Sequence, residues 1–299
     1  MMYQSPTGDD DAVIEATEAA DPRVPVVVAS PHSGRNYSAL FLEASRLDPV
    51  ALRRSEDSFV DEIFADAPGR GAAMIKALFP RAFLDTNREA FELDPEMFDD
   101  RLPGYVNTRS PRVIAGLGTI ARVVSQGHEI YKRKLHFAEA LERINSLYHP
   151  YHTSLLSLIR RTRQEFGYCI LLDGHSMPSY VPGHGDLPGH PTLQDIVLGD
   201  AHGTACAQEV MAVVERFLSR RGYRVTRNTP YAGGYTTRHY GRPDAAVHAI
   251  QIEINRGLYM DEQTLTRKPF LDDLRNDMGD LINTLASLDG KYLRGTAVS

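Results

Sequence analysis

The sequence lacks tryptophan altogether and has only two cysteines in 299 residues. Two cysteines cannot form the disulfide framework of a small secreted domain, so the core must come from apolar packing, for which the chain is long enough. Cys169 and Cys206 lie among apolar or small residues, which favours buried thiols and a cytoplasmic protein. No apolar run is long enough to cross a bilayer, and the acidic start at Asp9–Asp11 lacks the basic-then-apolar order of a signal peptide.

An excess of positive charge is also absent. The formal net charge of −6 excludes a general nucleic-acid binder but leaves room for a small anionic substrate, which a local arginine cluster can hold. The composition is otherwise that of a soluble globular protein. Because no repeat or linker is evident, we expect a flexible leader over residues 1–22, with a possible short helix at 13–20, and one catalytic domain over residues 23–290. The oligomeric state stays open.

The main feature of the sequence is a set of apolar runs, each followed by a residue that can bind a metal or transfer a proton. The runs cover residues 24–29, 170–172 and 246–252, and they lead to His32, His175 and Glu253. Such runs predict buried strands of an open α/β sheet, in which ligands bind beyond the carboxyl ends of the strands. Two imidazoles with carboxylates are the ingredients of a catalytic zinc site. The alternative is that Asp173 and His175 only fix a turn after a strand that ends at Leu172.

Other segments complete the expected fold. Further strands are predicted at residues 72–78, 82–84 and 223–226, and helices at 129–147, 155–166, 203–220 and 266–288. Pro150 should break the first two helices into a hairpin. The polar segment 89–112 is long enough for a lid or an insertion. His184 and His190 lie in a Gly- and Pro-rich loop, where flexible surface histidines are a more frequent outcome than a metal site.

Six motifs in order resemble the N-formylglutamate amidohydrolase family. They are Pro31-His-Ser-Gly34, Glu56-Asp57-x-x-Val-Asp61, Asp85-x-Asn-Arg88, Asp173-Gly-His-Ser-Met177, Gly233-Gly-Tyr-x-Thr-Arg-His-Tyr-Gly241 and Gln251-Ile-Glu-Ile-Asn-Arg-Gly-Leu-Tyr-Met260. The family is related to the zinc carboxypeptidases and the aspartoacylases. The resemblance implies an α/β fold, a single-domain three-layer sandwich in which helices flank a mixed central sheet, as in zinc carboxypeptidases.

The resemblance also implies one divalent metal, expected to be zinc. His32 resembles the first ligand and His175 the last. Carboxypeptidase-like relatives have a glutamate three positions after the first histidine, where this chain has Arg35. The acidic ligand should therefore come from the Glu56–Asp57 pair, of which Asp57 matches better.

The remaining roles follow from the same resemblance. Glu253 resembles the general base, which takes a proton from water and delivers it to the leaving amine. Asn87 and Arg88 resemble the element that holds the α-carboxylate of the substrate, since an arginine fork matches a carboxylate. Arg238 or Arg256 is expected at the side-chain carboxylate. Candidate donors to the developing oxyanion are Arg81, Arg238, His239 and Arg256.

The implied reaction is hydrolysis of N-formyl-L-glutamate to L-glutamate and formate, a step in histidine degradation, with no nucleic-acid or membrane partner. One alternative is an amidohydrolase for another N-acyl amino acid or a modified peptide end. A serine hydrolase built on Ser176 is another, although Pro178 occupies the last glycine position of the nucleophile elbow. A non-catalytic metal- or ligand-binding protein on the same fold is the third.

Overall fold

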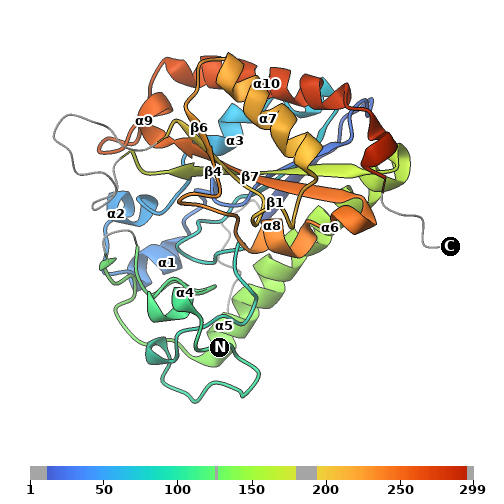
Figure 1. The fold of residues 1–299 in the computed structure, drawn as a ribbon. Helices are drawn as coiled ribbons and strands as arrows, with labels where there is room; N and C mark the ends of the chain where they lie inside the picture. The colour runs from blue at the N-terminus through green and yellow to red at the C-terminus, as the bar shows by residue number, and fades with distance from the viewer. Residues whose placement is uncertain (1–11, 125–126, 180–193, 295–299) are drawn as a thin grey trace. The chain divides into compact units, whose positions relative to one another are not determined.

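The computed structural model describes residues 12–124, 127–179 and 194–294 (Figure 1). Contacts along the chain divide it into two compact units. The first unit comprises Met1–Glu15, Pro31–Glu56 and Lys76–Ser154, and the second comprises Ala16–Ser30, Asp57–Ile75 and Leu155–Ser299. The second unit holds most of the sheet and its core.

A seven-stranded mixed sheet organises the chain, with strand order β1-β3-β2-β4-β7-β5-β6. The strands are β1 (Ile14–Thr17), β2 (Val26–Ser30), β3 (Ala73–Ala77), β4 (Cys169–Met177), β5 (Ile196–Gly199), β6 (Val225–Arg227) and β7 (Val247–Asn255). Strands β2, β4 and β7 run parallel, whereas β5 runs antiparallel to β7. A separate two-stranded ribbon pairs β8 (Met260–Asp261) with β9 (Thr266–Arg267).

Helices cover the sheet of the second unit. They are α3 (Val60–Ile63), α6 (His149–Phe166, which begins in the first unit), α7 (Gln208–Arg220), α8 (Tyr235–Tyr240), α9 (Arg256–Tyr259) and α10 (Phe270–Ala286). In Figure 1, α3, α7 and α10 lie on one side of the sheet and α6 and α8 on the other. The first unit contains α1 (Ala39–Ala44), α2 (Pro49–Arg53), α4 (Pro111–Ile114) and α5 (Phe137–Arg143). The predicted α/β class, a mixed sheet flanked by helices, is confirmed.

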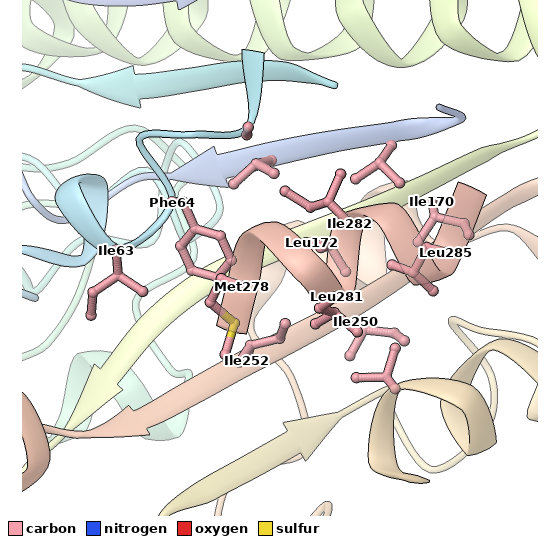
Figure 2. Packing of buried hydrophobic residues seen from close by; sticks show 14 of the residues in the cluster. Ile63, Phe64, Ile170, Leu172, Ile250, Ile252, Met278, Leu281, Ile282 and Leu285 are labelled. Atoms are coloured by element: carbon pink, nitrogen blue, oxygen red, sulfur yellow. The ribbon is translucent and has the colours of Figure 1, made fainter. Parts of the chain in front are cut away.

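The apolar core lies between the sheet and α3, α7 and α10. Figure 2 shows residues of β4 and β7 packed against α10: Ile170, Leu172, Ile250, Ile252, Met278, Leu281, Ile282 and Leu285. Gly174 is the next residue on this face of β4, and a Cβ atom there would lie 2.8 Å from the Phe64 ring. Side chains alternate along a strand, so residues 171, 173 and 175 point to the opposite face.

Strand β4 is longer than the sequence suggests. Its pairing with β7 runs without a break from Cys169↔Val247 to Met177↔Asn255. The expected strand end at Leu172 is therefore wrong, as is the alternative in which Asp173 and His175 only fix a turn, because both residues lie inside the strand. Glu253 likewise lies inside β7 and not beyond its end. Polar side chains are accommodated there because the backbone keeps its ladder of hydrogen bonds.

The expected helical hairpin is also wrong. A π-helix at Ile144–Tyr148 joins α5 directly to α6, so the helical segment continues past Pro150 to Phe166. Proline has no N–H to donate within a helix and its ring crowds the preceding turn. The wider π-turn, in which His149 N–H donates to Ile144 O, accommodates the proline without a break.

Three shorter segments differ from expectation as well. Residues 82–84 form a turn and not a strand, and Ile14–Thr17 form strand β1 where a short helix was expected. Strand β5 was not predicted. The proposed leader and domain boundaries stay predictions, and residues 1–11, His184 and His190 lie outside the described residues. Among the described helices, none has the length and apolarity needed to cross a bilayer.

Candidate active site

Two adjacent strands of the second unit carry a buried polar block. In the parallel register, Asp173 pairs with Gln251 and His175 pairs with Glu253. Because the partners in a parallel pair point to the same face, the four side chains form a two-by-two block on the face opposite the apolar core. All four are at most 7% exposed. Such buried polar groups need partners or a function.

His175 lies between two carboxylates. Its Nδ1 atom is 3.0 Å from Asp57 Oδ2, and its Nε2 atom is 3.1 Å from Asp173 Oδ1. Burial by itself favours the neutral ring, but the charge and hydrogen bonds of Asp173, together with the hydrogen bond to Asp57, raise the pKa of His175 well above its ordinary value. The sequence motif around His175 thus brings together an imidazole and two acidic groups.

Asp57 is held by groups from the ends of β4 and β7. Its Oδ1 atom accepts hydrogen bonds of 3.0 Å from Ser176 Oγ and from Arg256 Nη2. Arg256 Nε also donates to Ser176 Oγ at 2.9 Å. Arg256 was predicted to contact the substrate, but its side chain is 11% exposed and its guanidinium lies on Asp57. Ser176 donates its proton to a carboxylate and not to an imidazole, which disfavours a serine nucleophile.

The distance between His175 and Asp57 fits a shared metal ion. Two ligands of a tetrahedral zinc with bonds of about 2.0–2.1 Å lie about 3.3 Å apart. The Nδ1 and Oδ2 atoms, at 3.0 Å, are close to that separation. An imidazole and a carboxylate are also among the ligand types that zinc prefers in proteins.

Glu253 is oriented by a chain of hydrogen bonds. Gly234 N–H donates to Gln251 Oε1 at 2.7 Å, and Gln251 Nε2 donates to Glu253 Oε1 at 2.7 Å. The first bond fixes which end of the amide is the oxygen, so the second can only be a donation to the carboxylate. Gln251, which the sequence reading assigned no role, therefore positions the predicted base.

The first unit has its own buried cluster, centred on Asp85. His32 Nε2 lies 2.8 Å from Asp85 Oδ1, which also accepts from Asn87 N–H at 2.8 Å. Arg81 Nε donates to Asp85 Oδ2 at 3.0 Å. Burial alone would raise the pKa of Asp85, but Arg88, His32 and Arg81 hold it well below its usual range. Asp85 is therefore an ionised partner on the Nε2 side of the His32 ring.

Arg88 is anchored to the backbone of the same unit. Its Nε donates to Leu117 O at 3.0 Å and its Nη1 to Asn87 O at 2.7 Å, while Nη2 is 3.5 Å from Asp85 Oδ2. Burial lowers the pKa of this guanidinium. Arg88 thus has fewer N–H groups left for a substrate than the sequence suggests.

Glu56 forms hydrogen bonds with Tyr37 and Arg53. Tyr37 Oη donates to Glu56 Oε1 at 2.7 Å, and Arg53 Nε lies 3.2 Å from both carboxylate oxygens. These contacts favour Asp57 as the acidic ligand of the Glu56–Asp57 pair.

Arg238 and His239 lie on α8, outside the four-residue block. Arg238 lines a surface hollow of about 370 Å³ together with His202, Thr204 and Arg242, and the lining includes no residue of β4 or β7. His239 stacks on the Tyr235 ring, and burial and the charge of Arg242 lower its pKa. The catalytic roles predicted for these two residues stay predictions.

Comparison with known proteins gives one consistent picture. The family model for N-formylglutamate amidohydrolase matches residues 24–260. Two N-formylglutamate deformylases are 29% identical: that of Pseudomonas aeruginosa over 244 residues, 81% of this chain and 84% of the relative, and that of Pseudomonas putida over 248 residues, 80% and 83%.

Solved structures agree with this match. The N-formylglutamate amidohydrolase of Ralstonia eutropha JMP134 is 35% identical, with a TM-score of 0.84 over 92% of this chain and 97% of that one. A gene product of Agrobacterium tumefaciens is 16% identical, with a TM-score of 0.69 over 94% and 98%, which shows the fold alone.

Proposed function

The chain belongs to the N-formylglutamate amidohydrolase family, and from this premise we propose that it hydrolyses N-formyl-L-glutamate to L-glutamate and formate. The observation that carries the proposal is the buried block of Asp173, His175, Gln251 and Glu253, with Asp57 on His175. A general base and a metal-binding imidazole on neighbouring strands are what amide hydrolysis by water requires. The cytoplasmic location and the role in histidine degradation stay predictions.

The metal is proposed to be one zinc ion. His32, Asp57 and His175 are buried, and each offers one ligand atom, so this group could hold a metal ion. Two imidazoles and one carboxylate match catalytic zinc sites that keep a position open. When bound, zinc would supply a Lewis acid that makes water nucleophilic near neutral pH. The His32–Asp85 and His175–Asp57 contacts are the supporting geometry in each unit.

Glu253 is proposed to carry the proton through the reaction. Its carboxylate takes a proton from the attacking water as the water oxygen bonds to the formyl carbon. The carbon–nitrogen bond then breaks, and Glu253 returns the proton to the leaving amine nitrogen. Formate and the free amino acid are the products, and Glu253 ends the cycle ionised. The hydrogen bond from Gln251 keeps the same carboxylate oxygen oriented throughout.

Arg81 is the best-placed candidate of the first unit for a substrate carboxylate. Its side chain is 27% exposed, compared with 8% for Arg88. We propose that Arg81 contacts the carboxylate and that Asn87 and Arg88 shape the surrounding backbone. Arg256 is engaged with Asp57. The roles predicted for Arg238 and His239 stay predictions.

Metal analysis paired with product analysis tests the function. Protein purified without a histidine tag should contain about one zinc per chain. It should release formate from N-formyl-L-glutamate, lose this activity on chelation and regain it with zinc. N-formyl-L-glutamine, which lacks the side-chain charge, and N-acetyl-L-glutamate, which changes the acyl group, are the matched control substrates.

Each result separates the alternatives. Faster hydrolysis of a control substrate would move the assignment to another N-acyl amino acid. Zinc without hydrolysis of any of the three would support a binding protein on this fold. Formate release that survives complete metal removal would refute the metal-dependent mechanism.

A further inference from the structure

Asp173 is a buried carboxylate that the proposed reaction does not use directly. It is fully buried, in the middle of β4. Its Oδ2 atom lies 3.4 Å from Thr237 Oγ1, which is a long hydrogen bond. Within the part of the chain that the structure describes, its Oδ1 atom has no well-aligned hydrogen bond. A buried charge with so few donors is unfavourable for folding, so its presence calls for another reason.

The ring of His175 is a close polar neighbour of Asp173 Oδ1. The contact with Nε2 is 3.1 Å. Residues 173 and 175 stand on the same face of β4, two positions apart, so the strand itself sets this contact. The neighbour across the register is Gln251, whose amide is already engaged with Gly234 and Glu253. Asp173 is therefore directed at the imidazole of His175.

We propose that Asp173 is a positioning residue that keeps the proton of His175 on Nε2 and so presents Nδ1 as the metal-binding atom. A ring nitrogen can bind a metal only through its lone pair, and the hydrogen bond of the other nitrogen decides the tautomer. The Nδ1 atom faces Asp57 Oδ2, the other ligand of the second unit. This inference rests on the proposed function, because it concerns the metal of that site.

The arrangement has a counterpart in the first unit. His32 uses Nε2 for its contact with the Asp85 carboxylate, at 2.8 Å. Both predicted histidine ligands thus have an aspartate on Nε2. An aspartate on the distal nitrogen fixes the ring orientation and makes the other nitrogen more basic, and its loss weakens metal affinity about 10- to 100-fold.

The test is zinc affinity, measured by competition with a chromophoric chelator on the full chain. Asp173→Asn keeps the size of the side chain but removes its charge, and should bind Zn²⁺ about 10- to 100-fold more weakly than wild type. Its metal-free form should melt below the wild-type temperature, because the charge that pairs with the His175 ring has been removed. A merely structural carboxylate would show the lower melting temperature with unchanged Zn²⁺ affinity, so the affinity decides between the two roles.

Asp200→Asn is the matched control. Asp200 is also buried, at 2% exposure, but its Oδ1 atom accepts from Gly203 N–H at 2.9 Å and from Asn228 Nδ2 at 2.8 Å. This variant should melt at a lower temperature and bind Zn²⁺ with wild-type affinity. Asp173→Asn with an affinity within about threefold of wild type would overturn the inference.

Two further results keep the inference separable from the function. Wild-type protein that binds no Zn²⁺ would refute the proposed metal site and this inference together, whereas failure of the variant alone refutes only the inference. If Asp173→Asn does not fold, ¹⁵N NMR of zinc-loaded wild type, with the His175 ring assigned against His175→Gln, decides directly. A proton on Nε2 supports the role of Asp173, and zinc on Nε2 overturns it.

Discussion

Replacing Gln251 by methionine separates the orientation of Glu253 from its presence. Methionine has a similar length and volume but can neither accept from Gly234 N–H nor donate to the Glu253 carboxylate. Both hydrogen bonds are 2.7 Å long in the native protein, and Gln251 is 4% exposed. Because the site is buried, water does not readily replace either hydrogen bond, and the Gly234 N–H and the Glu253 carboxylate each lose a partner.

The magnitudes follow from the charge on each partner. A hydrogen bond to a charged group is worth about 1.5–3 kcal/mol, and one between neutral groups about 1 kcal/mol. If the bond to Glu253 is needed to aim its carboxylate in the transition state, kcat falls roughly 10- to 150-fold. KM should hold, because the amide of Gln251 is engaged within the protein. The unfolding free energy should fall by about 1–3 kcal/mol, which lowers Tm by several degrees.

Formate release and thermal unfolding of Gln251→Met should be measured beside Gln263→Met. Gln263 is exposed between β8 and β9, so its replacement tests the side-chain chemistry without the buried partners. The control should match wild type in kcat and Tm. If Gln251→Met lowers Tm but retains the wild-type kcat, Glu253 does not depend on the amide, and the reasoning from this hydrogen bond is refuted.

Three other predictions test different parts of the molecule. Glu253→Gln should retain its zinc and lose about 10²- to 10⁴-fold in kcat, by metal analysis and formate release; a near-normal rate would remove Glu253 from the mechanism. Gly174→Ala should lower the unfolding free energy by about 1–3 kcal/mol in urea titration, because its Cβ atom meets the Phe64 ring at 2.8 Å; an unchanged midpoint would show that the ring yields freely. Cys169 and Cys206 should not react with a thiol reagent at about pH 8 until denaturant is added, because burial raises the pKa of both thiols; rapid labelling of native protein would contradict this.

Much of the sheet could be predicted because its strands are apolar on at least one face. The runs before His32, His175 and Glu253 became β2, β4 and β7, three parallel neighbours in the sheet. What the runs could not show was where each strand ends. Polar residues at positions 173 and 175 suggested a turn, yet they alternate with Gly174 and Ser176 in a continuous strand. Strand β5 was missed because it has only four residues and follows a Gly- and Pro-rich stretch of sequence.

The partners of the candidate residues were harder to predict than the residues themselves. Arg256 contacts Asp57, which lies 199 residues away in the sequence, and a local sequence pattern cannot predict a contact between such distant residues. Its position after a strand suggested a substrate contact, which stays a prediction, but gave no sign of the contact with Asp57. The role of Gln251 did have a local signal: Gln251-Ile-Glu253 and Asp173-Gly-His175 both alternate polar and apolar or small residues. Read as period-two strands, they predict side-by-side pairs on one face.

The register between β4 and β7 determines both how the sheet folds and how the four polar side chains of the candidate site are aligned. A slip of β4 by a single residue would turn Asp173 and His175 toward the apolar side and place Gly174 or Ser176 opposite Glu253. The buried carboxylate and imidazole would then lie among isoleucines without partners, at a cost of several kcal/mol. The polar block therefore favours the correct register of the sheet, since a chain with β4 out of register would be both less stable and without an aligned site.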